Sequence, residues 1–516
     1  MIKNIKWLFL VSLTFVACNN SDDLVLDPNS SNGQPLTAGT ADFSKFVSIG
    51  NSLTAGYSDG ALFIEGQKGA YSNILAQQFS LVGGGEFKTP FMADNIGGFA
   101  GGNPAFGPRL YFNGVGPVAV PGTPTTDLTK VLTGGFNNLG VPGAKSFHLV
   151  AAGYGNIAGL ATGQSNPYFV RFASSPATSI IADAVAQNAS FFSLWIGNND
   201  VLSYATSGGV GVNQTGNMNP ATYGSNDITD PAVFASVYNS MITALTAKGA
   251  KGVVANIPYV TSVPYFTTVP TNAIPGLPPA NAAQLNQLFG GINAALAASG
   301  LPARFVTLVA DDGNAATIET NPLLIKDESL INISAAITDA LTPTLGGQTA
   351  GYLGSIYGQA RHASGAAATK DYIVLTARTI IGTIQTGAPS PFNTVGVSYP
   401  MQDNTTLTAS ETAEVKIATD AYNAAIRSIA TSKGLAFVDA NAVLAQVANG
   451  GITANGYTVS STYVSGGGFS MDGVHPSPRG YALIANQFME AINTTYGSNF
   501  KAVDLSKYRI QFTPKL

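Results

Sequence analysis

The feature of this sequence that most constrains its fold is the alternation of short apolar runs with helical patterns. Four runs are almost continuously apolar and have the length of strands: Phe46–Ile49, Phe191–Ile196, Val253–Ile257 and Leu435–Val438. Apolar residues on both faces of a strand are typical of a parallel sheet that helices cover on both sides. The sequence therefore predicts an α/β protein built on a doubly wound sheet.

Helical patterns lie between and after these runs. Asp230 followed by Pro231 is typical of a helix start, and four apolar residues then follow at helical spacing: Val233, Val237, Met241 and Leu245. A second helix is predicted over residues 411–431, directly before the last apolar run. The final helix is predicted to begin at Ser477, a good capping residue, and to carry an apolar stripe of Tyr481, Ile484, Ala485, Phe488 and Ile492.

Three stretches interrupt this alternation, and we interpret them as insertions at about 80–135, 203–228 and 260–405. The first two are rich in glycine, proline and threonine, which favours long loops. The third has patterns of its own, with a helix predicted over Ala283–Ala298 and a strand over Arg304–Val309. We therefore predict one domain over residues 43–500, followed by a C-terminal tail over 501–516.

The N-terminal segment has the parts of a secretory signal. Lysines precede an apolar run from Trp7 to Val16, and the small residue Ala17 stands directly before Cys18, the single cysteine of the chain. The apolar run is too short to span a bilayer. Residues 1–17 resemble a bacterial lipoprotein signal, which implies cleavage before Cys18 and attachment of lipid to its thiol. The alternative is an ordinary signal peptide with an incidental cysteine.

Residues 18–42 contain many Ser, Asn, Gly and Pro residues, and this composition predicts a flexible tether. The acidic pair Asp22 and Asp23 resembles the surface-export signals of Bacteroidota lipoproteins. The expected location is the cell envelope, with the protein lipid-anchored to the outer membrane on either its periplasmic or its cell-surface face.

Ser52 is the candidate nucleophile. It lies in the segment Gly50-Asn51-Ser52-Leu53, between the first predicted strand and a predicted helix. A serine at that junction presents its hydroxyl at the carboxyl edge of the sheet, where open α/β folds place their sites. Its backbone N–H, at a helix N-terminus, can stabilise an oxyanion. The alternative is that this Gly-x-Ser turn is only a turn.

The segment Asp472-Gly473-Val474-His475 supplies a candidate base. A carboxylate three residues before an imidazole can accept a hydrogen bond from Nδ1 and leave Nε2 free as a general base. An incidental surface Asp and His are the alternative. The chain has only three histidines, and His148 and His362 have no carboxylate at a comparable spacing. We expect both to be structural, although His148 lies near a site loop and could contact substrate.

Two further segments fit a serine mechanism. Asn199 closes the apolar strand segment Trp195-Ile196-Gly197-Asn198-Asn199-Asp200, and a side-chain amide at a strand end can donate to a tetrahedral oxyanion. The segment Asn138-Leu139-Gly140-Val141-Pro142-Gly143 is predicted to be a tight glycine loop whose backbone N–H approaches a substrate closely. Since Asn and Gly favour turns in general, plain loop structure is the alternative for both segments.

Taken in this order, the four segments resemble the motifs of the SGNH, or GDSL, hydrolase family. The resemblance covers roughly half of the chain: residues 43–80, 136–202, 229–259 and 411–495. It implies a three-layer α/β/α fold, flavodoxin-like, with a mostly parallel five-stranded sheet and large insertions. In that family one residue of each motif is functional, and the matching residues here are Ser52, Gly143, Asn199 and His475.

The resemblance also implies that Asp472 is the triad carboxylate and that Ser52, Gly143 and Asn199 form the oxyanion hole. Asn51 departs from the family pattern, which usually has Asp there, but an amide keeps the hydrogen-bonding shape. The implied activity is that of a serine ester hydrolase, a lipase or esterase, which needs no metal and no organic cofactor. A carbohydrate O-acetyl esterase of the same fold is one alternative, and a non-catalytic, glycan-binding surface lipoprotein is the other.

The expected partners are small-molecule, lipid or glycan esters and, through the lipid anchor, a membrane. A formal net charge of −4 without a basic run argues against nucleic acid. The insertion at 260–405 leaves the sheet where Ser52 is expected, so we predict a cap that selects the substrate. Its first turns offer apolar rings suited to an acyl chain or a sugar, those of Tyr259, Tyr265 and Phe266. A structural flap that packs elsewhere is the alternative.

Overall fold

The computed structural model describes residues 30–31 and 33–516. The predicted signal segment and the Cys18 lipid site lie outside the described residues. The core is built on a sheet of five parallel strands, which confirms the α/β class. From one edge to the other these strands are β15 (Ala436–Val438), β8 (Lys251–Ala255), β7 (Phe191–Trp195), β3 (Phe46–Gly50) and β6 (Asn138–Gly140).

Four of these strands are the apolar runs of the sequence, although β8 begins and ends two residues earlier than predicted. Strands β3 and β7 are buried along their whole length, as expected when helices cover both faces. Strand β6 is a correction. The sequence predicts a glycine loop over 138–143, but residues 138–140 pair in register with β3, Ser48 opposite Asn138 and Gly50 opposite Gly140.

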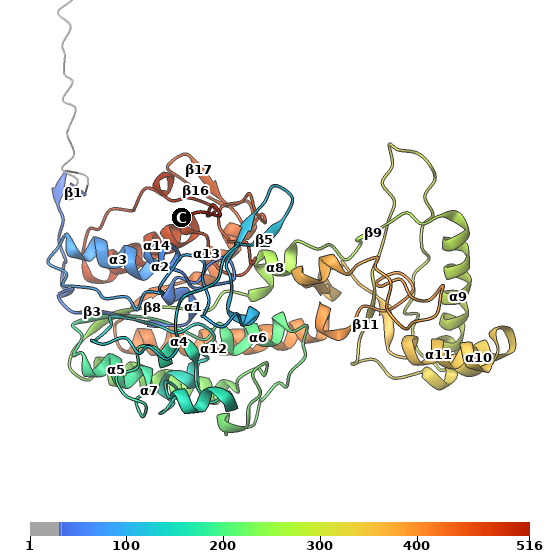
Figure 1. Ribbon diagram of the computed structural model, residues 1–516, viewed down its shortest axis with the longest axis horizontal. Coiled ribbons are helices and arrows are strands. Elements are labelled where there is room, and N and C mark those ends of the chain that lie inside the picture. Colours follow the sequence, from blue (N-terminus) through green and yellow to red (C-terminus); the bar gives the residue numbers. More distant parts are fainter. Residues whose placement is uncertain (1–29, 32) are drawn as a thin grey trace, which may run out of the picture.

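Helices cover both faces of the sheet (Figure 1). On one face lie α3 (Tyr71–Ser80), α13 (Ala440–Ala448) and α14 (Pro478–Tyr496), and on the other lie α5 (Ile180–Ala186), α7 (Pro231–Thr246) and α12 (Ala409–Ser432). Helices α7, α12 and α14 confirm the three helices predicted from the sequence. Asp230 and Ser477 cap α7 and α14, because each side chain accepts hydrogen bonds from N–H groups of the first turn.

The strand order creates a switch point in the sheet. Counted along the chain, the order across the sheet is 2-1-3-4-5, with β3 as the first strand and β7 as the third. In this topology a crevice opens outside the carboxyl ends of the first and third strands. Ser52 directly follows β3, and Asn199 follows β7 after a short turn. The fold therefore brings two of the predicted site residues to the same edge.

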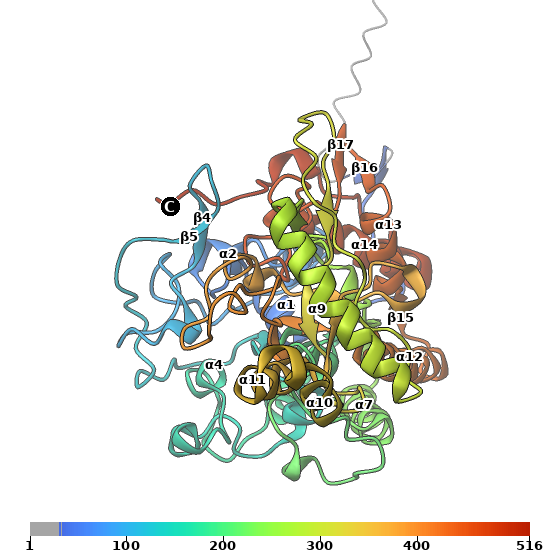
Figure 2. The same ribbon diagram turned by 90° about the vertical axis from the view of Figure 1, so that its right-hand side faces the viewer.

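The insertion at 260–405 forms a second lobe that projects from the core (Figures 1 and 2). It contains α9 (Pro279–Ala298), α10 (Ser334–Leu345), α11 (Gly347–Tyr357) and the short strands β9 (Ile274–Pro275), β10 (Thr320–Asn321), β11 (Leu324–Lys326) and β12 (Ala360–His362). Helix α9 confirms the helix predicted over 283–298. The strand predicted over 304–309 is wrong. The backbone of this segment bonds to side-chain amides of Asn286, Asn293 and Asn321 instead of a partner strand.

The remaining elements are short: β1 (Ser30–Ser31), β2 (Gln34–Pro35), α1 (Ser52–Ala55), α2 (Ile64–Lys68), β4 (Leu110–Phe112), β5 (Pro117–Ala119), α4 (Pro167–Val170), α6 (Asn199–Thr206), α8 (Pro264–Thr267), β13 (Tyr372–Ile373), β14 (Thr406–Leu407), β16 (Ile452–Ala454) and β17 (Tyr457–Val459). Apart from the β4–β5 hairpin and isolated turns, the stretch 80–135 is irregular, as predicted. The predicted loop over 203–228 begins later, since α6 continues to Thr206.

Both ends of the described chain make contacts with the core. The tether was expected to extend to residue 42, but Ala41 is buried and Thr40 N–H donates to the Tyr496 carbonyl at 2.8 Å. In the tail over 501–516, Phe512 packs edge-on against Phe63 with ring centroids 5.0 Å apart. Residues on both sides of the predicted domain therefore contact it.

Candidate active site

Ser52 is the first residue of α1, directly after β3. Asn51 caps this helix, because its Oδ1 accepts from the Leu53 N–H at 3.0 Å. The Asn51 Nδ2 also donates to Asn198 Oδ1 at 3.3 Å, so an amide at position 51 bridges the ends of β3 and β7. The helix is a single turn that ends at Gly56. The helix dipole expected to act at the Ser52 backbone N–H is therefore the dipole of a single helical turn.

Two glycines allow α1 to pack directly on the sheet. A Cβ at Gly140 would collide with the Ala55 backbone nitrogen, and a Cβ at Gly50 would collide with Thr54 Oγ1, both in α1. A larger residue at either position would push the turn away from the strands. Ser52 is consequently fixed against the sheet, with only 6% of its surface exposed.

The three residues predicted as a triad are in hydrogen-bonding contact. His475 Nε2 lies 2.9 Å from Ser52 Oγ, and His475 Nδ1 lies 2.9 Å from Asp472 Oδ2. An ionised carboxylate can only accept, so Nδ1–H donates to Asp472 and Nε2 is left to accept from the serine hydroxyl. Both distances fall within the range expected for a nucleophile and its general base.

Asp472 is held in its ionised form by the loop around it. Its Oδ1 accepts from the backbone N–H groups of Val474 and His475 at 2.9 and 2.8 Å, and its Oδ2 accepts from Gly60 N–H at 2.9 Å. Burial raises the pKa of this carboxyl, but the charge of His475 and these hydrogen bonds outweigh burial and lower the pKa to about 2. The carboxylate is therefore charged at neutral pH and can stabilise an imidazolium.

A segment directly after α1 supports the triad, and the sequence analysis missed it. The Tyr57 ring lies against the His475 imidazole with centroids 4.6 Å apart. Asp59 holds the loop that carries Asp472 and His475, because its Oδ1 accepts from Met471 N–H at 2.8 Å and its own N–H donates to Ser470 Oγ at 2.9 Å. Burial raises the pKa of Asp59 to about 7. The available signal was position alone, since both residues follow the nucleophile turn.

Asn199 and Gly143, the other predicted oxyanion donors, follow β7 and β6, the strands on either side of β3. Asn199 is buried at the start of α6, and its Nδ2 donates one hydrogen to the Ala144 carbonyl at 2.9 Å. An amide nitrogen carries two hydrogens, so one remains for a substrate oxygen. Gly143 lies three residues beyond β6 with φ of 79° and is exposed. Asn199 lines the cavity beside Ser52, whereas Gly143 is not among the residues that line it.

Replacing Asn199 by alanine should lower kcat roughly a hundredfold or more and leave KM nearly unchanged. This split is expected because the amide contacts an oxyanion more strongly than a ground-state carbonyl. Steady-state kinetics on a soluble ester would measure it, with Asn332→Ala in the second lobe as the control. A change confined to KM would assign Asn199 to substrate binding instead.

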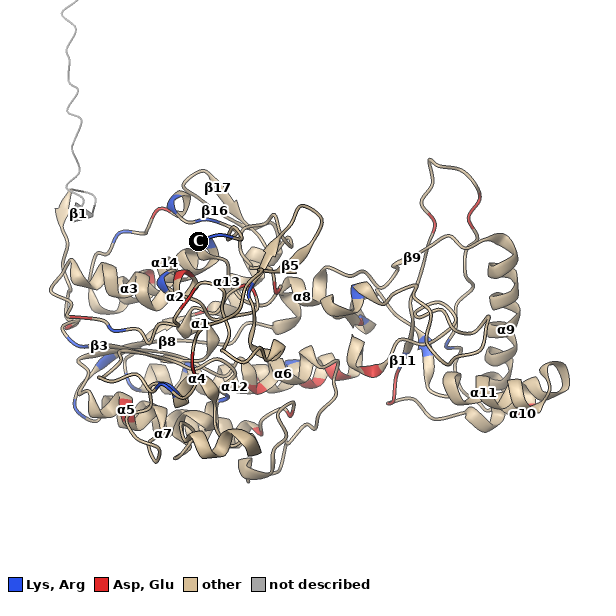
Figure 3. Cartoon of the chain, in the orientation of Figure 1, with Lys and Arg blue, Asp and Glu red and all other residues tan. Residues whose placement is uncertain are grey.

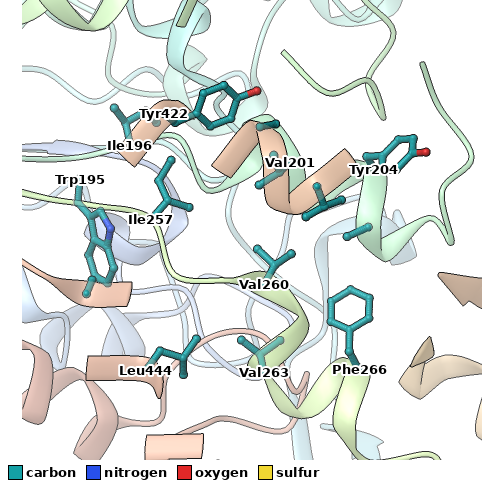
Figure 4. Packing of buried hydrophobic residues seen from close by; sticks show 14 of the residues in the cluster. Trp195, Ile196, Val201, Tyr204, Ile257, Val260, Val263, Phe266, Tyr422 and Leu444 are labelled. Atoms are coloured by element: carbon teal, nitrogen blue, oxygen red, sulfur yellow. The ribbon is translucent and has the colours of Figure 1, made fainter. Parts of the chain in front are cut away.

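An apolar cavity opens beside Ser52 and His475. Its walls come from many elements: Leu53, Trp195, Leu202, Pro258, Val260, Val263, Val443, Leu444, Val447, Val459, Phe469, Leu483 and Ile484. Figure 4 shows Trp195, Val260, Val263 and Leu444 around one region of the packing. Nearly all of the wall is aliphatic or aromatic, so the cavity suits a hydrocarbon chain better than a hydrated group.

The start of the insertion lies at the site, but the aromatic residues predicted to face substrate do not. Val260 and Val263 line the cavity, and Tyr265 N–H donates at 2.9 Å to the carbonyl of Gly473, in the loop that carries Asp472 and His475. Phe266 is buried in the core, and the Tyr259 hydroxyl donates to Asp420 Oδ1 at 2.5 Å on α12. Only the first turns of the insertion therefore touch the cavity, and the rest belongs to the second lobe.

The other two histidines occupy structural positions, as expected. His148 Nδ1 accepts from Lys145 N–H at 3.1 Å, and its ring stacks on Tyr154. His362 Nδ1 accepts from Val306 N–H at 2.9 Å in the second lobe. Burial lowers the pKa of both to about 4, so both are neutral at physiological pH. Neither His148 nor His362 is among the residues that line the cavity.

The geometry places a serine hydroxyl, an imidazole and a fixed carboxylate in series at one end of an apolar cavity. Such a series can remove a proton from the hydroxyl as that oxygen attacks a carbonyl carbon. In comparisons with protein-family models, with curated proteins and with solved structures, no match to this chain was found.

Proposed function

We propose that this protein is a serine ester hydrolase that acts through an acyl-enzyme on Ser52. The observation that carries the proposal is the series Ser52, His475 and Asp472, joined by two contacts of 2.9 Å at the mouth of an apolar cavity. The strand order 2-1-3-4-5, with Ser52 and Asn199 at its switch point, supports membership of the SGNH, or GDSL, hydrolase family.

The reaction proceeds in two halves. His475 Nε2 takes the proton of Ser52 while Oγ attacks the ester carbonyl, and Asp472 stabilises the imidazolium that forms. The oxyanion is held by the Asn199 amide together with the backbone N–H groups of Ser52 and Gly143. The imidazolium then gives its proton to the leaving alcohol. Water activated by the same histidine cleaves the acyl-enzyme and frees the serine.

The substrate class follows from the cavity. An acyl chain would bury its methylenes against the aliphatic wall, whereas an acetyl group would leave most of the space empty and a sugar would lose its hydrogen bonds to water. An ester of a longer acyl chain is therefore favoured over a carbohydrate O-acetyl ester. A protein that only binds glycans has no need of a hydroxyl, imidazole and ionised carboxylate in series, which disfavours the non-catalytic alternative.

Turnover of p-nitrophenyl esters should rise with acyl length from acetate to octanoate. Each buried methylene contributes about 0.8 kcal/mol, which is about fourfold in kcat/KM. Leu444→Trp fills the cavity and should remove this gain while leaving acetate turnover intact. Ala445→Trp, on the exposed side of the same helix α13, is the matched control. Equal rates for all chain lengths, or preference for acetylated xylan, would exclude the acyl-chain assignment.

We also propose that the protein is exported and lipid-anchored through Cys18. The support is the signal-like sequence of residues 1–17. In the part of the chain that the structure describes, every helix is too short or too polar to traverse a lipid bilayer.

Cys18→Ser should abolish lipid attachment and leave the precursor uncleaved or the protein mislocalised, because the acylated thiol is lost. Metabolic labelling with a fatty acid and fractionation of membranes would measure the effect, with Ser21→Ala as control. Normal lipid labelling of the Cys18→Ser protein would contradict the anchor.

A further inference from the structure

Three carboxylates from distant parts of the chain converge where the second lobe meets the core. Glu328 follows β11, Asp403 precedes β14, and Glu411 lies in the first turn of α12. One oxygen from each lies within 4.8 Å of the others. Figure 3 shows acidic residues along α12 and again beside β11. The cluster has no part in the proposed hydrolysis, because none of its three members lines the cavity.

The cluster contains buried oxygens that lack a donor. Glu411 is only 6% exposed; its Oε2 accepts from Thr408 N–H at 2.7 Å and from Thr408 Oγ1 at 2.8 Å. Its Oε1 and the Oδ1 of Asp403 are buried and have no hydrogen-bond partner among the described residues. The carboxylate of Glu328 faces both residues and cannot donate to either when all three are ionised.

Electrostatics leave these groups without a sufficient counter-charge. Burial, and then the neighbouring Glu328, raises the pKa of Asp403 to about 7, and burial with Glu328 likewise raises the pKa of Glu411 to about 8. Lys326 is the cation that faces Asp403 and lowers its pKa only in part. When all three carboxyls are ionised, three negative charges therefore lie near Lys326.

The other ionisable groups around the cluster are already paired. Asp327 accepts from Arg361 at 2.7 Å. From α6, the Tyr204 hydroxyl donates to Glu414 Oε2 at 2.9 Å, and burial and that carboxylate raise the tyrosine pKa. The backbone after α6 comes close to the cluster, because a Cβ at Gly209 would collide with the Glu411 carboxyl group. The site thus lies between the lobe and helices α6 and α12, with Glu328 exposed and Glu411 buried.

We propose that Glu328, Asp403 and Glu411 bind a divalent cation of the calcium class that fastens the second lobe to the core. All the ligand atoms are oxygens, which Ca²⁺ prefers, and it accepts oxygens at about 2.4 Å in flexible geometry. Two oxygens around such an ion are at most about 4.8 Å apart, and the three ligand oxygens here all lie within 4.8 Å of one another. The cation supplies the positive charge that the buried Oε1 lacks, and the ligands come from both lobes.

The test is calorimetric titration of CaCl₂ into chelator-treated full-length protein near pH 8, with thermal unfolding in parallel. We expect one bound ion per chain and a rise in Tm by several degrees, since an ion that binds only the folded state stabilises it. MgCl₂ should give a smaller response, because Mg²⁺ demands stricter octahedral geometry.

Variants decide whether this cluster is the site. Glu328→Gln changes an exposed residue and should fold normally, and Asp403→Asn keeps the shape of the side chain; each should lower calcium affinity at least tenfold. Asp339→Asn, an exposed acid on α10, should bind calcium as the original protein does. The absence of binding heat and of any Tm shift would show that the carboxyls only share protons. Undiminished binding in both cluster variants would place the ion elsewhere. Either result overturns the proposal.

Discussion

Replacing Ser52 by alanine should lower kcat for ester hydrolysis by roughly a millionfold, the scale found when a nucleophilic serine is removed from such a triad. The Ser52 hydroxyl lies 2.9 Å from His475 Nε2 and can form an acyl-enzyme. Without it, catalysis is restricted to water and to the oxyanion donors. Stopped assays at high enzyme concentration would measure the residual rate.

The same variant should lose all labelling by a small fluorophosphonate, because the reagent forms its bond with Ser52 Oγ. Ser80→Ala, an exposed serine at the end of α3, is the control and should label as the original protein does. Labelling that persists in Ser52→Ala would show that another residue is the nucleophile and would remove the basis of the proposed function.

Asp472→Asn should lower kcat about ten-thousandfold while the protein still folds. An asparagine can present a donor to Nδ1 and thereby favour the wrong imidazole tautomer, in which Nε2 carries the proton and cannot accept one from Ser52. Kinetics and near-ultraviolet circular dichroism, measured together, separate this loss from unfolding. A variant that retains more than a tenth of the activity would show that His475 needs no carboxylate.

The pH dependence of stability gives a second measure of Asp472. Its pKa of about 2 in the folded protein lies below the unfolded value of about 3.9. The folded state therefore gains stability from the ionised group above about pH 4, and this gain is lost as the pH falls toward 2. Chemical unfolding from pH 6 to 2 should show a shallower loss of stability in Asp472→Asn than in the original protein.

Much of the sheet was predictable, because four of its five strands coincide with uninterrupted apolar runs in the sequence. Strand β6 was not, since Asn138, Leu139 and Gly140 form a short segment whose glycine suits a turn equally well. Only the pairing of Gly140 against β3, and its contact with α1, reveals why glycine is required there. For Arg304–Val309 the error was the opposite one, because a strand was predicted where the structure has none. Its pattern resembles a strand, but asparagine side chains take the place of a strand partner.

The candidate site was predictable where its parts are local. Asp472 and His475 are three residues apart, so a tight loop alone can join them. The cavity was not predictable, because Val443, Leu444 and Val447 on α13 recur at the spacing of an ordinary core-facing helix. The periodicity of apolar residues shows that one face of a helix is apolar. It does not show whether that face packs against protein or borders a cavity.

The contact between Ser52 and His475 joins positions 423 residues apart. During synthesis the serine leaves the ribosome long before the base and its carboxylate exist, and a chain threaded through a translocation channel keeps them apart. On the proposed function, the nascent polypeptide carries an inert hydroxyl. Esterolytic capacity would begin only after the last strand and α14 have docked, so the producing cell's own lipids are not exposed to a half-made enzyme.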